Sequence, residues 1–287
     1  MWHESPRTAR IAGTDEEEVN ANKEVEDSTA DADWEDFSRL IYDCCLKGYE
    51  KEVEELLDCE RDSNPPNVNW VSPSNMTPLF VAVRTGNLRI MQALIKAGAD
   101  VNFVFPGDPY MNSCLMEAAN LGLTNVVRFL IDAGANVSQR RAFDDRTALH
   151  YASEKGFSII VSMLLDNLPS GAVDTLTNYD GGEFTPLFIA AHYGHAAAVT
   201  TLINAGANVN FRCGSKQRSI LLNTVIEGRF ESVRLLLIAG SDPRIADLDG
   251  ITPAYMAKLF GYPQIISLIE RNIKVRLLAE AHAAHPC

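Results

Sequence analysis

The sequence has no long apolar run and no cysteine motif, and both absences narrow the class of protein. No stretch of about 18 apolar residues occurs, so we expect no membrane insertion. The first residues lack the apolar core of a secretory signal, so we expect no such signal. The six cysteines form no Cys-x-x-Cys pair and are scattered, which is typical of a reducing compartment. We therefore expect a location in the cytoplasm, the nucleus or both.

Positive charge is also in short supply. The net charge is −13, from 38 acidic and 25 basic residues. Residues 1–36 hold 12 of the acidic residues and only three basic ones, which leaves 26 against 22 in the rest of the chain. Without a basic stripe, binding to nucleic acid is not expected. Residues 1–36 are dense in charge and poor in large apolar residues, so we expect a disordered acidic tail. It is either a solubilising leader or a docking or self-masking arm for a basic partner.

Catalytic and cofactor motifs are missing as well. No glycine-rich phosphate loop or Ser/His/Asp arrangement has a recognisable context, since Asp180-Gly181-Gly182 falls in a turn between repeated units. Cys44 and Cys45 occupy positions that alanines fill in other units, which favours small core residues over a redox pair. The side chains with the spacing of metal ligands are His192 and His195, and at the C-terminus His282, His285 and Cys287, where no fourth ligand is in reach. We expect no enzyme and no cofactor.

What the sequence does contain is a repeat. Six Thr/Ser-led triplets begin at Thr77, Ser113, Thr147, Thr185, Ser219 and Thr252, and a glycine follows nine residues after each start, at Gly86, Gly122, Gly156, Gly194, Gly228 and Gly261. The intervals between triplets are 36, 34, 38, 34 and 33 residues. A period of this size is the signature of a stacked repeat array, which usually binds along an extended face.

Each unit reads as two short helices joined by a glycine turn. Thr and Ser are good N-caps, Pro78, Pro186 and Pro253 suit the first helical position, and a glycine can end the helix in the left-handed conformation. Apolar residues recur fourteen and seventeen residues after each start, as at Met91 and Leu94, and form one face of the second helix. The sequence therefore predicts an all-α repeat solenoid of helix–turn–helix units.

These columns resemble the ankyrin repeat. Residues 185–195, Thr-Pro-Leu-Phe-Ile-Ala-Ala-His-Tyr-Gly-His, are similar to the consensus first helix and turn of that family, and residues 96–102 and 204–210 are similar to its tail. His192 and His195 stand where the consensus tolerates or prefers His. Of the six units only His150 keeps the family's His at the fourth position, which implies altered local hydrogen bonding in the others. The resemblance covers roughly residues 38–271.

The end units look degenerate, as terminal caps should. An earlier unit can be placed with Arg39 as its start and Gly48 as its glycine, and the last unit has Glu270 where the others are apolar. We expect about seven units in an ankyrin repeat domain over residues 37–271, with the first and last as caps. A helical extension or tail, residues 272–287, should follow.

In the ankyrin architecture, the turn before each first helix projects as a β-hairpin or loop finger, and the fingers and first helices line a concave groove. By register the fingers are residues 72–76, 108–112, 142–146, 180–184, 214–218 and 247–251. Large apolar side chains and arginines recur there and on the groove-facing helix positions, which are the usual makings of an interface. The resemblance thus implies partner-binding residues, namely Met76, Arg84, Tyr110, Leu121, Phe143, Arg146, Phe184, Tyr193, Arg218 and Phe260. Some of the aromatic residues could instead pack between neighbouring fingers.

The implied function is a non-catalytic adaptor or scaffold, expected to be monomeric on its own, that binds another protein or a linear peptide with acidic and apolar residues in this groove. Asn102 and Asn210 resemble asparagine hydroxylation sites of ankyrin repeats, although both could simply hydrogen-bond the turn. The alternative function is the substrate-recognition subunit of a cullin-type ubiquitin ligase. Such a subunit needs a C-terminal box longer than the 16 residues after Arg271, which argues against it unless the sequence is a fragment of a longer chain. An enzyme or a metal-dependent regulator is the remaining class.

Overall fold

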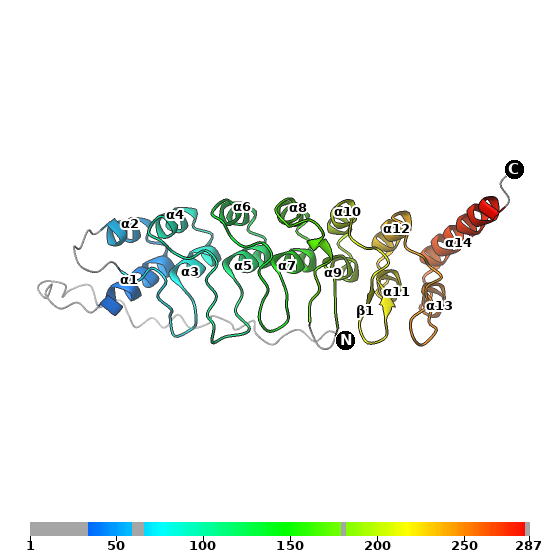
Figure 1. Cartoon of the computed structure of the whole chain (residues 1–287), viewed down its shortest axis with the longest axis horizontal. Helices are drawn as coiled ribbons and strands as arrows, with labels where there is room; N and C mark the ends of the chain where they lie inside the picture. The colour runs from blue at the N-terminus through cyan, green and yellow to red at the C-terminus, as the bar shows by residue number, and fades with distance from the viewer. Residues whose placement is uncertain (1–33, 59–65, 179–181, 285–287) are drawn as a thin grey trace, which may run out of the picture.

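A computed structural model describes residues 34–58, 66–178 and 182–284 of the chain. Seven helix pairs follow one another along an elongated array, with the first helices in one row and the second helices in the other (Figure 1). The pairs are α1 (Trp34–Lys47) with α2 (Glu50–Asp58), α3 (Pro78–Thr85) with α4 (Leu88–Lys96), α5 (Cys114–Leu121) with α6 (Thr124–Asp132), α7 (Ala148–Lys155) with α8 (Ser158–Asp166), α9 (Pro186–Tyr193) with α10 (Ala196–Asn204), α11 (Ile220–Ile226) with α12 (Phe230–Ile238), and α13 (Pro253–Leu259) with α14 (Pro263–Ala284). The predicted repeat solenoid is confirmed.

The local chemistry of each unit explains the helix limits. Thr77 Oγ1 accepts a hydrogen bond from Phe80 N at 3.2 Å, and the same cap recurs at Ser113, Thr185, Ser219 and Thr252. Thr147 is the exception, because its backbone N–H donates to Nδ1 of the buried His150 at 3.1 Å. The far nitrogen of that ring, Nε2, therefore carries the proton and donates to the Thr175 carbonyl at 2.9 Å. His150 thus links α7 to the long loop before α9.

The core is continuous through the array. Every first helix packs on the first helix of the next pair, as α5 does on α7, and most second helices pack on the next second helix, as α6 does on α8. The repeated apolar columns are almost fully buried, at Leu79, Leu115, Leu149, Leu187 and Leu221 in the first helices and Met91, Val127, Val161, Val199 and Val233 in the second. Because each unit buries its faces only against its neighbours, stability accumulates along the stack.

The recurring glycines provide space as well as a left-handed turn. Gly122 has φ 74°, and a Cβ added there would lie 2.5 Å from Cζ of Phe157 in the next unit. His195, Arg229 and Tyr262 press in the same way on Gly156, Gly194 and Gly228. Phe157, His195, Arg229 and Tyr262 each directly follow the glycine of their own unit, and each reaches back over the glycine of the unit before it.

Fingers connect the pairs, and only one of those described contains paired strands. β1 (Arg212–Cys213) pairs antiparallel with β2 (Arg218–Ser219). In the other described fingers a backbone hydrogen bond closes the turn, as from Arg141 N to Arg146 O at 2.9 Å. A short 3₁₀ helix, η1 (Ala172–Asp174), lies in the long connection between α8 and α9. The expected β-hairpin form thus applies to the finger before α11, and the loop form to the other fingers of which every residue is described.

The two ends of the array extend past the repeat columns. α1 begins at Trp34, three residues before the expected domain start, and the expected tail up to residue 33 lies outside the described residues. α14 is one helix from Pro263 to Ala284 and projects beyond α13 (Figure 1), so the second helix of the last unit and the C-terminal extension are continuous. None of the helices in the described ranges combines the length and apolar character that a bilayer crossing requires.

Candidate functional site: the finger face

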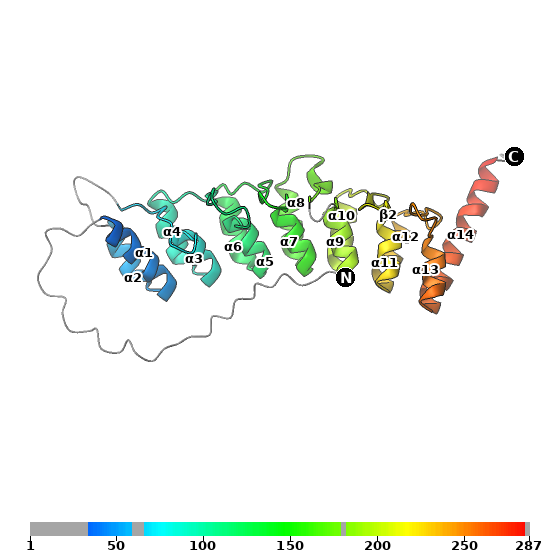
Figure 2. The ribbon, with the colours of Figure 1, turned by 90° about the horizontal axis from the view of Figure 1, so that it is seen from below.

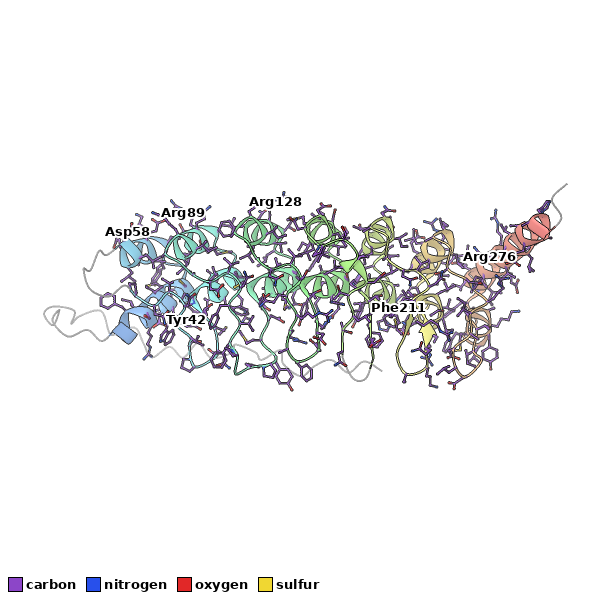
Figure 3. The ribbon with its side chains drawn as sticks, in the orientation of Figure 1. Tyr42, Asp58, Arg89, Arg128, Phe211 and Arg276 are labelled. Carbon is purple, nitrogen blue, oxygen red and sulfur yellow. The ribbon has the colours of Figure 1, made fainter. Side chains whose placement is uncertain are left out.

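We call the side of the array from which the fingers project the finger face. Figure 1 shows the fingers below the row of first helices, and Figure 2, seen from below, shows those helices side by side along the molecule. Side chains crowd the finger tips and the adjoining helix surfaces (Figure 3). All ten predicted partner-binding residues belong to fingers or to the C-terminal ends of first helices.

The predicted apolar residues divide into an exposed and a half-buried group. The side chains of Tyr110, Leu121, Phe143, Tyr193 and Phe260 are between 40% and 53% exposed. Met76 and Phe184 are half-buried and pack against the core, and the rings of Phe184 and Phe188 have centroids 4.8 Å apart. The exposed group is therefore available to a partner, whereas Met76 and Phe184 contribute to holding the fingers.

Tyr110 and Phe143 form an aromatic pair across two neighbouring fingers. Their ring centroids lie 4.3 Å apart with an interplanar angle of 40°, although their side chains are 53% and 43% exposed. A backbone hydrogen bond from Phe143 N to Pro109 O, at 3.0 Å, joins the two fingers directly. The two rings thus form an aromatic surface that is already ordered in the absence of a partner. Preorganisation of this kind reduces the entropy that binding would cost.

Arg141 braces the Phe143 finger from within. Its guanidinium donates to both carboxylate oxygens of the buried Asp144, through Nε to Oδ1 at 2.8 Å and through NH2 to Oδ2. It also lies 6.0 Å from the Phe143 ring centroid and 5.6 Å from that of Tyr151. Burial would lower the pKa of Arg141, but the hydrogen bond to Asp144 raises it overall. Arg141 therefore remains charged and fixes the finger.

A second network connects three consecutive first helices on this face. Tyr151 donates through its hydroxyl to Asn112 Oδ1 at 2.8 Å, and Asn112 Nδ2 donates to Glu117 Oε2 at 3.0 Å. Glu117 in turn pairs with Arg84 at 3.5 Å. The Arg146 guanidinium lies 4.5 Å from the Tyr151 ring centroid and is bonded to Glu154. The groups run without a break from α3 to α7.

The charged groups of this network are paired with one another. Burial raises the pKa of Tyr151 to about 12, so its phenol remains a hydrogen-bond donor. Burial would raise the pKa of Glu154, but Arg146 lowers it below the ordinary value. The remaining predicted cation, Arg218, faces Asp247 at 3.4 Å. Each of the three predicted arginines therefore already has a carboxylate partner, and the charge available to a ligand is smaller than the sequence indicates.

The histidines with metal-like spacing have structural partners. His195 Nε2 donates to the Glu154 carbonyl at 2.8 Å. His192 is buried, and burial lowers its pKa even though Glu227 lies 3.7 Å away. His282 Nδ1 lies 2.7 Å from the Leu278 carbonyl, whereas His285 and Cys287 are outside the described residues. In the described part of the chain, no three His, Cys, Asp or Glu side chains meet in a way that could hold a metal ion.

The two asparagines singled out for hydroxylation lie away from the finger tips, in the turns that follow the second helices. Asn102 Oδ1 accepts from Asn136 N at 2.7 Å, and its Nδ2 donates to the Gly134 carbonyl at 3.2 Å. Asn210 Oδ1 accepts from Asp242 N at 3.1 Å. Both side chains thus bridge to the next unit, and hydroxylation at either position stays a prediction.

One feature of this face was missed from the sequence. Trp70, in the degenerate first unit, lines a hollow of about 430 Å³ together with Arg39, Phe105 and residues 71–73 and 75. The signal available was the single tryptophan between the first helix pair and the first finger. The sequence could not reveal that Phe105, 35 positions further along, lines the same hollow.

Comparison with known proteins places these features in a family. Models of the ankyrin repeat match residues 74–104 and, as three copies, residues 115–213. The B-cell lymphoma 3 protein homolog of Mus musculus is 30% identical over 68% of this chain and 44% of its own length. Ankyrin repeat and SOCS box protein 3 of Bos taurus is 30% identical over 62% of this chain and 33% of its own length.

A solved ankyrin repeat domain from Acinetobacter baumannii is 30% identical, with a TM-score of 0.60, and covers 68% of this chain and 97% of that domain. The chain spans less than half the length of the first curated relatives that it matches. The repeats that match the family models coincide with the N-capped first helices and glycine turns of the structure, as at α9. The chain belongs to the ankyrin repeat family.

Proposed function

We propose that this protein is a non-catalytic adaptor that binds an extended segment of a partner protein on its finger face, between α3 and α9. Ankyrin repeats are protein–protein interaction modules, and the family match indicates no catalytic class. The observation that carries the proposal is the Tyr110–Phe143 pair, because two large aromatic rings are preformed yet largely open to solvent. Exposed aromatic surface that is rigidly held is the usual centre of an interface.

The chemistry of the face specifies the partner more narrowly than the sequence does. The cations Arg84, Arg146 and Arg218 already bind carboxylates of this chain, whereas the side chains of Tyr110 and Phe143 are 53% and 43% exposed. An acidic segment would have to compete with Glu117, Glu154 and Asp247. We therefore propose that apolar and aromatic side chains of the partner make the main contacts, with acidic residues in a secondary role at Arg84, whose side chain is 46% exposed.

The test compares binding partners of Tyr110→Ala/Phe143→Ala with those of a matched control. The control, Ile159→Ala/Ile238→Ala, removes two apolar side chains that are 64% and 70% exposed on the row of second helices. Full-length tagged variants are purified from cells, bound proteins are compared by quantitative mass spectrometry, and thermal melts show that each variant folds. We expect a specific protein to be lost from the finger variant alone, and about a 30-fold weaker affinity for it in vitro. Identical partner sets in all samples would refute the finger-face assignment.

Substrate recognition for a cullin-type ubiquitin ligase is the second candidate, and the relative with a SOCS box favours it. That relative is a longer protein of which this chain covers 33%. Cullin subunits among the bound proteins, retained in the finger variant while another protein is lost, would support this role. Their absence from every sample would leave the adaptor role alone.

The proposed setting is the cytoplasm or the nucleus, with the protein monomeric in the absence of its partner. The free thiols of Cys44, Cys45, Cys114 and Cys213 are buried, and burial raises the pKa of Cys45, Cys114 and Cys213 to about 12. Such thiols are inert core residues. Light scattering of the purified protein and imaging of a tagged chain test the two statements.

A further inference from the structure

The hollow at the N-terminal end of the array is separate from the aromatic pair. It lies between α1 and the first two fingers and is lined by Arg39, Trp70, Val71, Pro73 and Phe105 among others. Tyr42, labelled in Figure 3, fixes the Trp70 ring from α1, with centroids 5.6 Å apart at 64°. Trp70 and Phe105 thus both line the hollow, whose space of about 430 Å³ is sufficient for one or two side chains.

Arg39 gives this hollow an exposed positive charge. No ion pair joins it to a carboxylate among residues 37–58, 66–178 and 182–283, whose side chains the structure describes. This sets it apart from Arg84, Arg146 and Arg218 on the finger face. Both carboxylate oxygens of Asp108 accept hydrogen bonds from other groups. Oδ1 accepts from Tyr110 N at 2.9 Å, and Oδ2 accepts from Asn75 Nδ2 at 3.4 Å. The hollow therefore suits an apolar side chain flanked by carboxylates.

The chain itself carries such a sequence close by. Residues 1–33 hold ten acidic and three basic residues and lead directly into α1, in which Arg39 is the sixth residue. Within this segment Val25 has carboxylates on both sides, in Glu24-Val25-Glu26-Asp27. The nine residues from Val25 to Trp34 can span up to about 30 Å, whereas the helix from Trp34 to Arg39 rises only about 7.5 Å. A segment tethered at this distance has an effective concentration in the millimolar range.

We propose that residues 24–27 of this chain occupy the hollow, with the Val25 side chain between Trp70 and Phe105 and the flanking carboxylates facing Arg39. Val19 is the weaker alternative, because its neighbouring carboxylates lie on one side only and it is farther from α1. The bound segment covers the N-terminal end of the finger face and leaves Tyr110 and Phe143 open. This inference does not depend on the proposed function.

The test follows the indole N–H resonance of Trp70 in the ¹⁵N-labelled full-length chain, assigned with Trp70→Phe. Glu24→Gln/Glu26→Gln/Asp27→Asn removes the proposed carboxylates, and Glu16→Gln/Glu17→Gln/Glu18→Gln removes the same number of charges elsewhere in the segment. We expect the first variant, Val25→Ser and Arg39→Gln each to shift the Trp70 resonance, and the matched variant to leave it in place. Added salt should move the wild-type resonance toward its position in the first variant, because exposed ion pairs are screened.

Three results would overturn the proposal. The Trp70 resonance would be unchanged in both the first variant and Arg39→Gln, or both charge-removing variants would shift it equally, or the shift would vanish on dilution. The last result would mean that a second copy occupies the hollow in place of the chain's own segment. Thermal melts of all variants ensure that a shift reports the hollow and not a folding defect, since the replaced carboxylates precede the described array and Arg39 is exposed.

Discussion

Gly122 ends α5 in the left-handed conformation and lies under the ring of Phe157 from the next unit. Replacing it with alanine perturbs the protein in two separable ways. At φ 74° an alanine is strained, and its Cβ would lie 2.5 Å from Phe157 Cζ and 2.8 Å from Cε2. Gly86 occupies the same place one unit earlier, with φ 72° and nothing within 4 Å of an added Cβ. Gly86→Ala is therefore a matched control that carries the backbone strain alone.

The expected magnitudes follow from these two contributions. A left-handed conformation costs an L-residue roughly 1–2 kcal/mol, which should be the whole loss of stability in Gly86→Ala. Forcing an extra carbon against a packed ring adds about 1–3 kcal/mol. Phe157 is half-buried and packs on the core, so the ring cannot simply turn away into solvent. We expect Gly122→Ala to lose about 2–5 kcal/mol in total.

Urea unfolding followed by circular dichroism measures both variants against wild type. Phe157→Leu removes the ring atoms that meet the new Cβ, so the double variant Gly122→Ala/Phe157→Leu should lose less than the sum of its single variants. A coupling of at least about 1 kcal/mol is expected for residues in direct contact. Equal losses in Gly122→Ala and Gly86→Ala, together with additive behaviour in the double variant, would refute the idea that the glycine column provides space for the next unit.

Three further predictions concern buried and bridging polar groups. Burial lowers the pKa of His150 to about 3, whereas an unfolded histidine titrates near 6.5. The folded state is therefore destabilised as the pH falls below about 6.5, by about 2 kcal/mol at pH 5. In urea unfolding, His150→Gln should lack this part of the pH dependence. The Ser153 hydroxyl is buried without a hydrogen-bond partner in the described structure, so Ser153→Ala should raise the free energy of unfolding by about 1 kcal/mol, and a loss in the same assay would show that the hydroxyl is bonded. Asn102→Ala should lose about 1–2 kcal/mol because two hydrogen bonds to the next unit disappear, while Asn208→Ala, whose side chain caps only its own turn, should lose less. Mass spectrometry of Asn102 from cells, which detects the gain of one oxygen, tests the predicted hydroxylation.

The fold could be predicted from the sequence alone because the same pattern of capping and apolar residues recurs in each repeat. The start of each first helix is defined by a capping Thr or Ser, and its end by a glycine nine residues later. Both signals act through contacts between residues close in sequence. The apolar columns at Leu115 and Val127 are spaced for helices that need neighbours on both sides. Local capping and a fixed period therefore determined the helix pairs, their number and their order.

The exposure and the ion pairing of the site residues depend on contacts between units, which the spacing of residues in the sequence does not reveal. Whether Phe143 is exposed and Phe184 half-buried follows from how each finger rests on its neighbour. Whether Arg146 is free to bind a ligand depends on Glu154, which lies eight residues away on the facing end of α7. The hollow beside Trp70 is lined by Arg39 of α1 and by Phe105 from the loop after α4, two residues that are 66 positions apart in the sequence. Short-range chemistry thus determined the scaffold, and packing between units decided which side chains that scaffold leaves open.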